Sequence, residues 1–418
     1  MLNIIWIAFF VSAFLMALYR ALVLGDGGVW TELVNSVFVS SKAAFSIALN
    51  LTGILCFWLG LLKIAEASGI TGLLARALYP LFRRIMPGVP AESPALSSMI
   101  MNIAANMLGL DNAATPMGLK AMEQLQQLNP KKDTASDAQI LFMVINTSAV
   151  TLIPITILMY RAELGSVNPS AVFMPILFAT SLSTLSGFLA VAWVQKLNIF
   201  NRVVLGWLLG FAVFIGAVAW HFQSLPPAER LQTSAAWGNF ILFAFIVSFI
   251  TAGLIRRINV YETFVQGAKE GFDIAVRIIP YLVAMLVAIA VLRASGVLNV
   301  IVLGFENFFA FLGIDTDFVP ALPTAILKPL SGSGARAMMI ETMQTYGADS
   351  FPAFVSSVVQ GSTETTFYVL AVYFGAVRIT KIRSALPCAL LADFVGIVSA
   401  VVLAYLFQYF IYIHVFVE

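Results

Sequence analysis

The chain has 418 residues, of which 60% are hydrophobic and only 11% are charged, with a mean hydropathy of +0.94. A soluble protein of this length carries far more charge on its surface, so the composition predicts an all-α polytopic membrane protein. The formal net charge of +2 gives no reason to expect a nucleic-acid polymer as a partner. Walker A, HExxH and GxSxG motifs are absent from the sequence, so neither an enzyme nor an ATP-driven pump is expected.

Apolar stretches predict about nine membrane spans, near residues 2–23, 45–63, 138–160, 171–195, 203–221, 235–255, 275–296, 353–376 and 385–414. Two further apolar segments, 96–125 and 319–344, are interrupted by polar residues together with glycine or proline. Their halves are too short to cross about 30 Å of hydrocarbon, so each segment is predicted to form a re-entrant helical hairpin. The stretch 258–273 suits an interfacial helix, and the segments around 76–84 and 297–318 are expected to be loops.

The loops between these elements differ in their content of basic residues. Nine spans place every basic loop on one side, whereas the loops 161–170, 222–234, 297–318 and 345–352 contain only Arg161 and Arg230. By the positive-inside rule, the N-terminus is expected in the cytoplasm and the C-terminus outside. The apolar N-terminal stretch lacks a basic start and a cleavage site, so it is interpreted as a retained first span.

The sequence also contains an internal repeat. Residues 41–69 align without gaps on residues 268–296, with nine identical positions. The first copy is predicted to run from outside to inside and the second from inside to outside, because one additional span separates the halves. We therefore expect two inverted-topology repeats, 1–200 and 234–418, with a linking span in 201–233.

Polar residues gather at four places in the apolar sequence: the two hairpin breaks and a polar helix break in the span that follows each hairpin. Interrupted segments at matching places in two halves indicate a transporter binding site near the membrane midplane. Packing of helices through hydroxyl and amide groups is the structural alternative for such residues. The candidate substrate-binding residues are Asn106, Asn112, Thr115, Asn146, Thr147, Ser148, Ser331, Ser333, Arg336, Ser362, Thr363 and Thr366.

Four charged residues are predicted to lie deep in the membrane, where a charge costs about 2.5–3.5 kcal/mol and is normally paired or functional. Asp111 and Glu364 are candidates to carry a coupling proton or to bind Na⁺, and Lys328 and Arg336 are candidates to contact an anionic substrate. The alternative is structural ion pairing, of Glu364 with Arg336 or of Asp111 with Lys328. Asp393 is assigned to a segment end, and neither a metal site nor another cofactor is expected.

Long motifs in the two halves resemble the spore maturation protein A and B families, whose members carry a nucleoside-recognition (Gate) domain. FWLGLLKIAEASG, LGLDNAATPMGLKAMEQL and VINTSAVTLIP carry the first resemblance, and LSGSGA and GSTETTFYVLAVYFG are among the motifs that carry the second. The resemblance implies a fused protein with the fold of a secondary transporter for small polar solutes.

These observations favour an H⁺- or Na⁺-coupled transporter of a small polar or anionic metabolite in a bacterial inner membrane. The expected partners are a small-molecule substrate and the lipid bilayer, and a homo-oligomer is left open as a further partner. A membrane scaffold for envelope or spore maturation, with polar breaks that serve only helix packing, and a channel remain the alternatives.

Overall fold

The computed structural model describes residues 2–90, 92–109 and 111–409, and these residues form helices joined by short turns. The elements of the first half and of the linking span are α1 (Leu2–Val23), α2 (Val29–Ala67), α3 (Ile70–Ile85), α4 (Pro94–Met107), α5 (Asp111–Leu128), α6 (Asp137–Thr147), α7 (Ile155–Glu163), η1 (Pro169–Val172), α8 (Phe173–Gln195) and α9 (Arg202–Ser224). The elements of the second half are α10 (Pro227–Ile255), α11 (Val260–Ala294), α12 (Val297–Phe311), η2 (Val319–Ala321), α13 (Leu322–Leu327), α14 (Gly332–Tyr346), α15 (Phe351–Ser362), α16 (Thr366–Ala376), α17 (Ala385–Ala404) and η3 (Tyr405–Tyr409).

Seven of the described helices are long and apolar enough to cross a membrane, namely α1, α2, α8, α9, α10, α11 and α17. The predicted spans 138–160 and 353–376 are not continuous, because each is split into two short helices, α6 and α7 or α15 and α16. The predicted hairpins are confirmed as pairs of contacting helices, α4 with α5 and α13 with α14. The 14 residues of α4 and the six of α13 are too few to cross about 30 Å of hydrocarbon. The chain is therefore an all-α polytopic membrane protein.

Three expectations about connecting segments are wrong. The predicted loops around 76–84 and 297–318 contain the helices α3 and α12. In α3, buried Leu78, Phe82 and Ile85 recur at helical spacing while Arg83 and Arg84 stay exposed, and this pattern forms an amphipathic helix too short to span. The stretch 258–273 is also no separate helix, because it continues into α11 without a break.

The repeated helices α2 and α11 pack against each other along much of their length. Gly267 of α11 lies against Leu59 and Gly60 of α2, whereas Gly271 lies against Leu55 and Cys56. Higher numbers in one helix meet lower numbers in the other, so the two helices are antiparallel. Glycines four residues apart allow two helix backbones to approach closely in a membrane. Equivalent helices that pack in opposite directions are what an inverted repeat requires.

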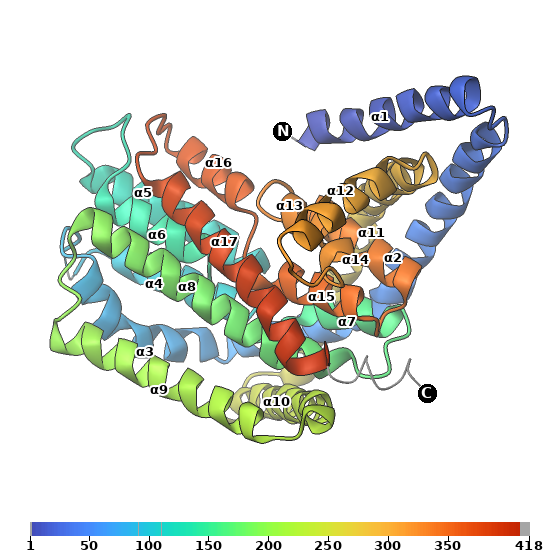
Figure 1. Cartoon of the computed structure of the whole chain (residues 1–418). Coiled ribbons are helices and arrows are strands. Elements are labelled where there is room, and N and C mark those ends of the chain that lie inside the picture. The colour runs from blue at the N-terminus through green and yellow to red at the C-terminus, as the bar shows by residue number, and fades with distance from the viewer. Residues whose placement is uncertain (1, 91, 110, 410–418) are drawn as a thin grey trace.

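Other contacts follow the same symmetry. Helix α1 packs against α11, while α10, the corresponding helix of the second half, packs against α2. Each half then continues through a short helix (α3 or α12), a hairpin, a broken span and a long helix, α8 or α17, and these two long helices lie side by side (Figure 1). The helix α9 follows α8 as the additional span. The domain limits at 200 and 234 stay a prediction.

The loops meet in two groups, each of which joins loops predicted to share one side of the membrane; the sides themselves stay a prediction. Between α7 and the loop before α15, the buried Arg161 pairs with Asp349 at 2.8 Å and donates to the Ala348 carbonyl at 3.0 Å. Among the basic loops, Lys381 pairs with Asp133 at 2.7 Å. The Lys381 ammonium holds the pKa of the Asp133 carboxyl below its usual range. We call these two contacts the Arg161 latch and the Lys381 latch; each joins one half of the chain to the other.

Replacing Gly267 should weaken the pairing of α2 with α11. A Cβ atom at Gly267 would lie 2.4 Å from the backbone oxygen of Leu59, whereas a Cβ at Gly53, also helical, meets no atom within 4 Å. We expect Gly267→Ala to lower the free energy of unfolding by about 1–3 kcal/mol, measured by denaturant titration in mixed micelles. Gly53→Ala is the control and should leave stability equal or slightly higher. Equal stability of the two variants would contradict the close packing.

The Arg161 latch should be the stronger of the two latches. In Asp349→Ala, the guanidinium of Arg161, of which 1% is exposed, loses its anionic partner. We expect a loss of about 2–3 kcal/mol, less than for a fully buried pair because Asp349 is partly exposed. Asp133→Ala, which breaks the exposed Lys381 latch, is the control and should change the melting temperature little. A larger effect of Asp133→Ala would reverse this ranking.

Candidate functional site

The two hairpin breaks and the two broken spans meet in the interior of the protein. The amide of Leu152, in the break between α6 and α7, donates to the Met107 carbonyl at the end of α4 at 2.9 Å. In the second half, the amide of Phe367 in α16 donates to the Pro329 carbonyl in the hairpin break at 3.0 Å. Each hairpin break is thus attached to the broken span of its own half.

A third backbone hydrogen bond joins the halves. The amide of Glu364, between α15 and α16, donates to the Thr147 carbonyl at the end of α6 at 2.8 Å. Backbone groups freed by a helix break in a membrane must be paired within the protein or face water. These contacts pair several of them and bring the four breaks together.

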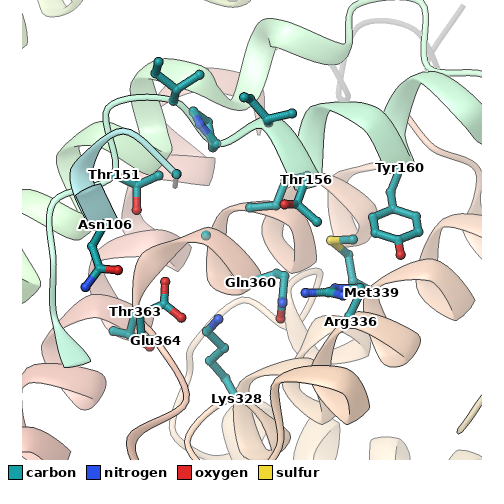
Figure 2. Close-up of a pocket in the computed structure, with 16 residues that line it drawn as sticks. Asn106, Thr151, Thr156, Tyr160, Lys328, Arg336, Met339, Gln360, Thr363 and Glu364 are labelled. Atoms are coloured by element: carbon teal, nitrogen blue, oxygen red, sulfur yellow. The ribbon is translucent and has the colours of Figure 1, made fainter. Parts of the chain in front are cut away.

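A cavity of about 110 Å³ lies at this meeting point. All four breaks line it, so both halves of the chain contribute to its wall (Figure 2). The lining residues are Asn106, Gly109, Thr151, Ile153, Pro154, Ile155, Thr156, Ile157, Tyr160, Lys328, Arg336, Met339, Gln360, Gly361, Thr363 and Glu364.

Two cations and one acid face this cavity. Lys328 is 4% exposed, and Figure 2 shows its ammonium group pointing into the cavity toward the Glu364 carboxylate. The Arg336 guanidinium lies 5.9 Å from the centre of the Tyr160 ring. In the part of the chain that the structure describes, Nε of Arg336 and Oε1 of Gln360 are buried and have no hydrogen-bond partner. The lining therefore has an excess of one positive charge and buried polar atoms suited to a polar or anionic ligand.

Asparagine side chains support the first hairpin. Asn106 donates to the Asn146 side-chain oxygen at 3.3 Å, and Asn146 donates in turn to Asn102. The Asn102 amide closes the hairpin by donating to the Ala114 carbonyl in α5 at 2.7 Å. Of these three, only Asn106 lines the cavity.

Some of the predicted site residues come together at the cavity and others do not. Asn106, Lys328, Arg336, Thr363 and Glu364 line it. The residues that do not line it, among those whose side chains are described, are Thr115, Asn146, Thr147, Ser148, Ser331, Ser333, Ser362 and Thr366.

Several of the residues away from the cavity have local structural roles. Thr147 and Ser148 donate to the Val144 carbonyl, and Ser362 donates to the Val359 carbonyl, which is helix back-bonding. Ser331 begins α14 by accepting from the Gly334 amide at 3.0 Å, and its hydroxyl contacts that of Ser333 at 3.3 Å. Thr115 is exposed.

The structure also bears on the predicted ion pairs. Glu364 and Arg336 both line the cavity, but they do not form a salt bridge between their described side chains. Asp111 and Asn112 lie at the start of α5, and their side chains lie outside the described part of the chain. The predicted pair of Asp111 with Lys328 therefore lies outside it too.

Sequence reasoning missed three neighbours of the site. Tyr160 and Met339 carry no signal in an apolar helix, and their roles depend on which helix face meets the cavity. Asp393 did carry a signal, because a single acid in an apolar stretch is costly. Its assignment to a segment end was wrong: it is 2% exposed in the interior of α17.

Comparison with known proteins agrees with these observations. The family model described as nucleoside recognition (Gate) matches residues 48–166 and 275–380. Spore maturation protein B of Bacillus subtilis is 46% identical over 158 residues, which cover 38% of this chain and 87% of that protein. Spore maturation protein A of the same organism is 38% identical over 183 residues, covering 44% of this chain and 90% of that protein. No solved structure matches the chain.

The two family matches cover the hairpins and broken spans of both halves, which are the segments that build the cavity. The chain therefore belongs to the nucleoside-recognition (Gate) family of membrane proteins and is related to both spore maturation protein A and spore maturation protein B.

Proposed function

We propose that the protein is a secondary transporter, driven by H⁺ or Na⁺, which binds a small anionic or polar metabolite in the cavity between the four breaks. The observation that carries this proposal is the placement of Lys328 and Arg336, two cations from the second hairpin, in a polar cavity lined by both halves. A buried cation is costly unless it is paired or meets an anionic ligand. Inverted repeats with discontinuous helices at the midplane are the usual architecture of such carriers.

The size of the cavity bears on the substrate. Its volume of about 110 Å³ is below the roughly 300–1,000 Å³ of pockets that enclose drug-sized ligands. In this conformation it suits a small organic anion, and a nucleoside would enter only after the hairpins had moved apart. The nucleoside in the family's description is therefore a second substrate class to test.

The cations of the cavity should be required for binding. We expect a thermal-shift screen of small carboxylates, phosphorylated metabolites and nucleosides to identify compounds that raise the melting temperature of the purified protein. Lys328→Gln and Arg336→Gln should each weaken binding of an anionic hit at least tenfold, because each removes one charge that meets the anion. The control is Lys381→Gln, which removes an exposed cation outside the cavity.

Flux of the same compound into proteoliposomes should saturate with concentration and require an ion gradient. Undiminished flux in Lys328→Gln and Arg336→Gln would contradict the site. Ohmic currents would indicate a channel. Absence of both binding and flux would favour the scaffold alternative, for which the back-bonded hydroxyls at the helix breaks are packing contacts.

We further propose that the chain lies in the bacterial inner membrane with its N-terminus in the cytoplasm and its C-terminus outside. The two groups of contacting loops support this arrangement. With Cys56 and Cys388 replaced by alanine, Val167→Cys should react with a membrane-impermeant maleimide in intact spheroplasts. Lys131→Cys should react only after lysis. The opposite pattern would invert the orientation, and labelling of both from one side would contradict nine crossings.

A further inference from the structure

Asp393 is an acid in the interior of the protein that the cavity does not include. It is 2% exposed and lies in α17, which packs against α6, α8, α15 and α16. Those four helices contain one charged residue, Asp137, which pairs with Arg383 at 2.7 Å near the cytoplasmic loops. The cation that acts on Asp393 is Lys328, through Coulomb attraction. A buried carboxylate in this surrounding needs a further partner.

Two threonines, Thr363 at the end of α15 and Thr366 at the start of α16, lie within hydrogen-bonding reach of the Asp393 carboxylate. Helix α17 lies directly on this break, since a Cβ at Gly396 would come within 2.8 Å of the Thr363 methyl group. Both Asp393 carboxylate oxygens and the hydroxyls of Thr363 and Thr366 are buried, and none reaches full hydrogen-bond geometry with any described atom. Four neighbouring oxygens in this state indicate a ligand that all of them can face.

We propose that Asp393, Thr363 and Thr366 form a Na⁺ site. A proton on Asp393 would occupy one carboxylate oxygen and the two hydroxyls could donate to the other, whereas a hard cation takes all four oxygens as ligands at once. The break at the end of α15 also frees backbone carbonyls of the kind that transporter helix breaks offer to Na⁺. A divalent ion is disfavoured, because one carboxylate beside Lys328 supplies too little negative charge. Within the described residues, no group of three or more His, Cys, Asp or Glu side chains gathers.

Two residues, Thr363 and Lys328, connect the Na⁺ site with the cavity. Thr363 lines the cavity and also faces Asp393, while Lys328 lines the cavity and is attracted by the Asp393 charge. Na⁺ at Asp393 offsets that attraction and raises the positive potential of the cavity, where Lys328 and Arg336 meet an anion. Binding of each ligand then favours binding of the other. This coupling rests on the proposed transport function; the Na⁺ site itself does not.

The site is tested without any substrate. The full-length protein in lipid nanodiscs is melted over a series of NaCl concentrations at constant ionic strength, with choline chloride or KCl as replacement. We expect a saturable rise of the melting temperature with Na⁺ that K⁺ and choline do not reproduce. Equal melting of the wild type in all three salts, or a response to pH with none to Na⁺, would overturn the proposal.

Variants locate the site. Asp393→Asn should abolish the rise of the melting temperature with Na⁺. Thr366→Val should raise the apparent Kd for Na⁺ at least tenfold. Thr366→Ser keeps the hydroxyl oxygen and should therefore retain most of the wild-type affinity for Na⁺. Thr342→Val is the matched control, because Thr342 is equally buried but its hydroxyl bonds to the Met338 carbonyl within α14. A wild-type Na⁺ response in both Asp393→Asn and Thr366→Val would refute the assignment.

The two proposals can fail separately. Loss of the Na⁺ response with intact anion binding leaves the transporter proposal standing with another coupling ion. An intact Na⁺ response without any anion hit leaves the ion site standing without the transport function.

Discussion

Inside a bilayer, a helix that ends within the membrane leaves amide and carbonyl groups that lipid cannot pair. In this protein, hydrogen bonds between the helix breaks pair several of these groups. Met107 with Leu152 and Pro329 with Phe367 are the same contact made once in each half. Thr147 with Glu364 joins the two halves at the cavity. Because the backbone is paired in this way, side chains at the breaks remain available to line a polar space.

The antiparallel packing of α2 and α11 gives this arrangement its symmetry. Gly267 and Gly271 bring the two repeated helices into backbone contact, and the hairpins and broken spans follow each helix in the same order. The result is a cavity with walls from both halves but with its cations, Lys328 and Arg336, from the second alone. The two halves therefore share an architecture and differ in their chemistry.

Much of this architecture could be predicted from the sequence, because glycine, proline and polar residues in apolar segments mark breaks directly. The hairpins and the antiparallel repeat follow from such signals, and so do Lys328, Arg336 and Glu364 at the cavity. Side-chain direction could not be predicted: Ser148 and Ser362 bond to their own helices, and Tyr160 turns into the cavity. Asp393 was misplaced because hydropathy gives the length of a span and not the neighbours of one residue within it.

The two latches differ in how far water reaches them. Of the Lys381 and Asp133 side chains, 70% and 56% are exposed, whereas only 1% of Arg161 is. Mobile ions screen exposed charges over a Debye length of about 8 Å at physiological ionic strength and act much less on buried ones. A rise in salt at the face that carries the Lys381 latch therefore loosens the connection between the halves there and leaves the Arg161 latch nearly unchanged, so ionic strength acts on the protein mainly from one side.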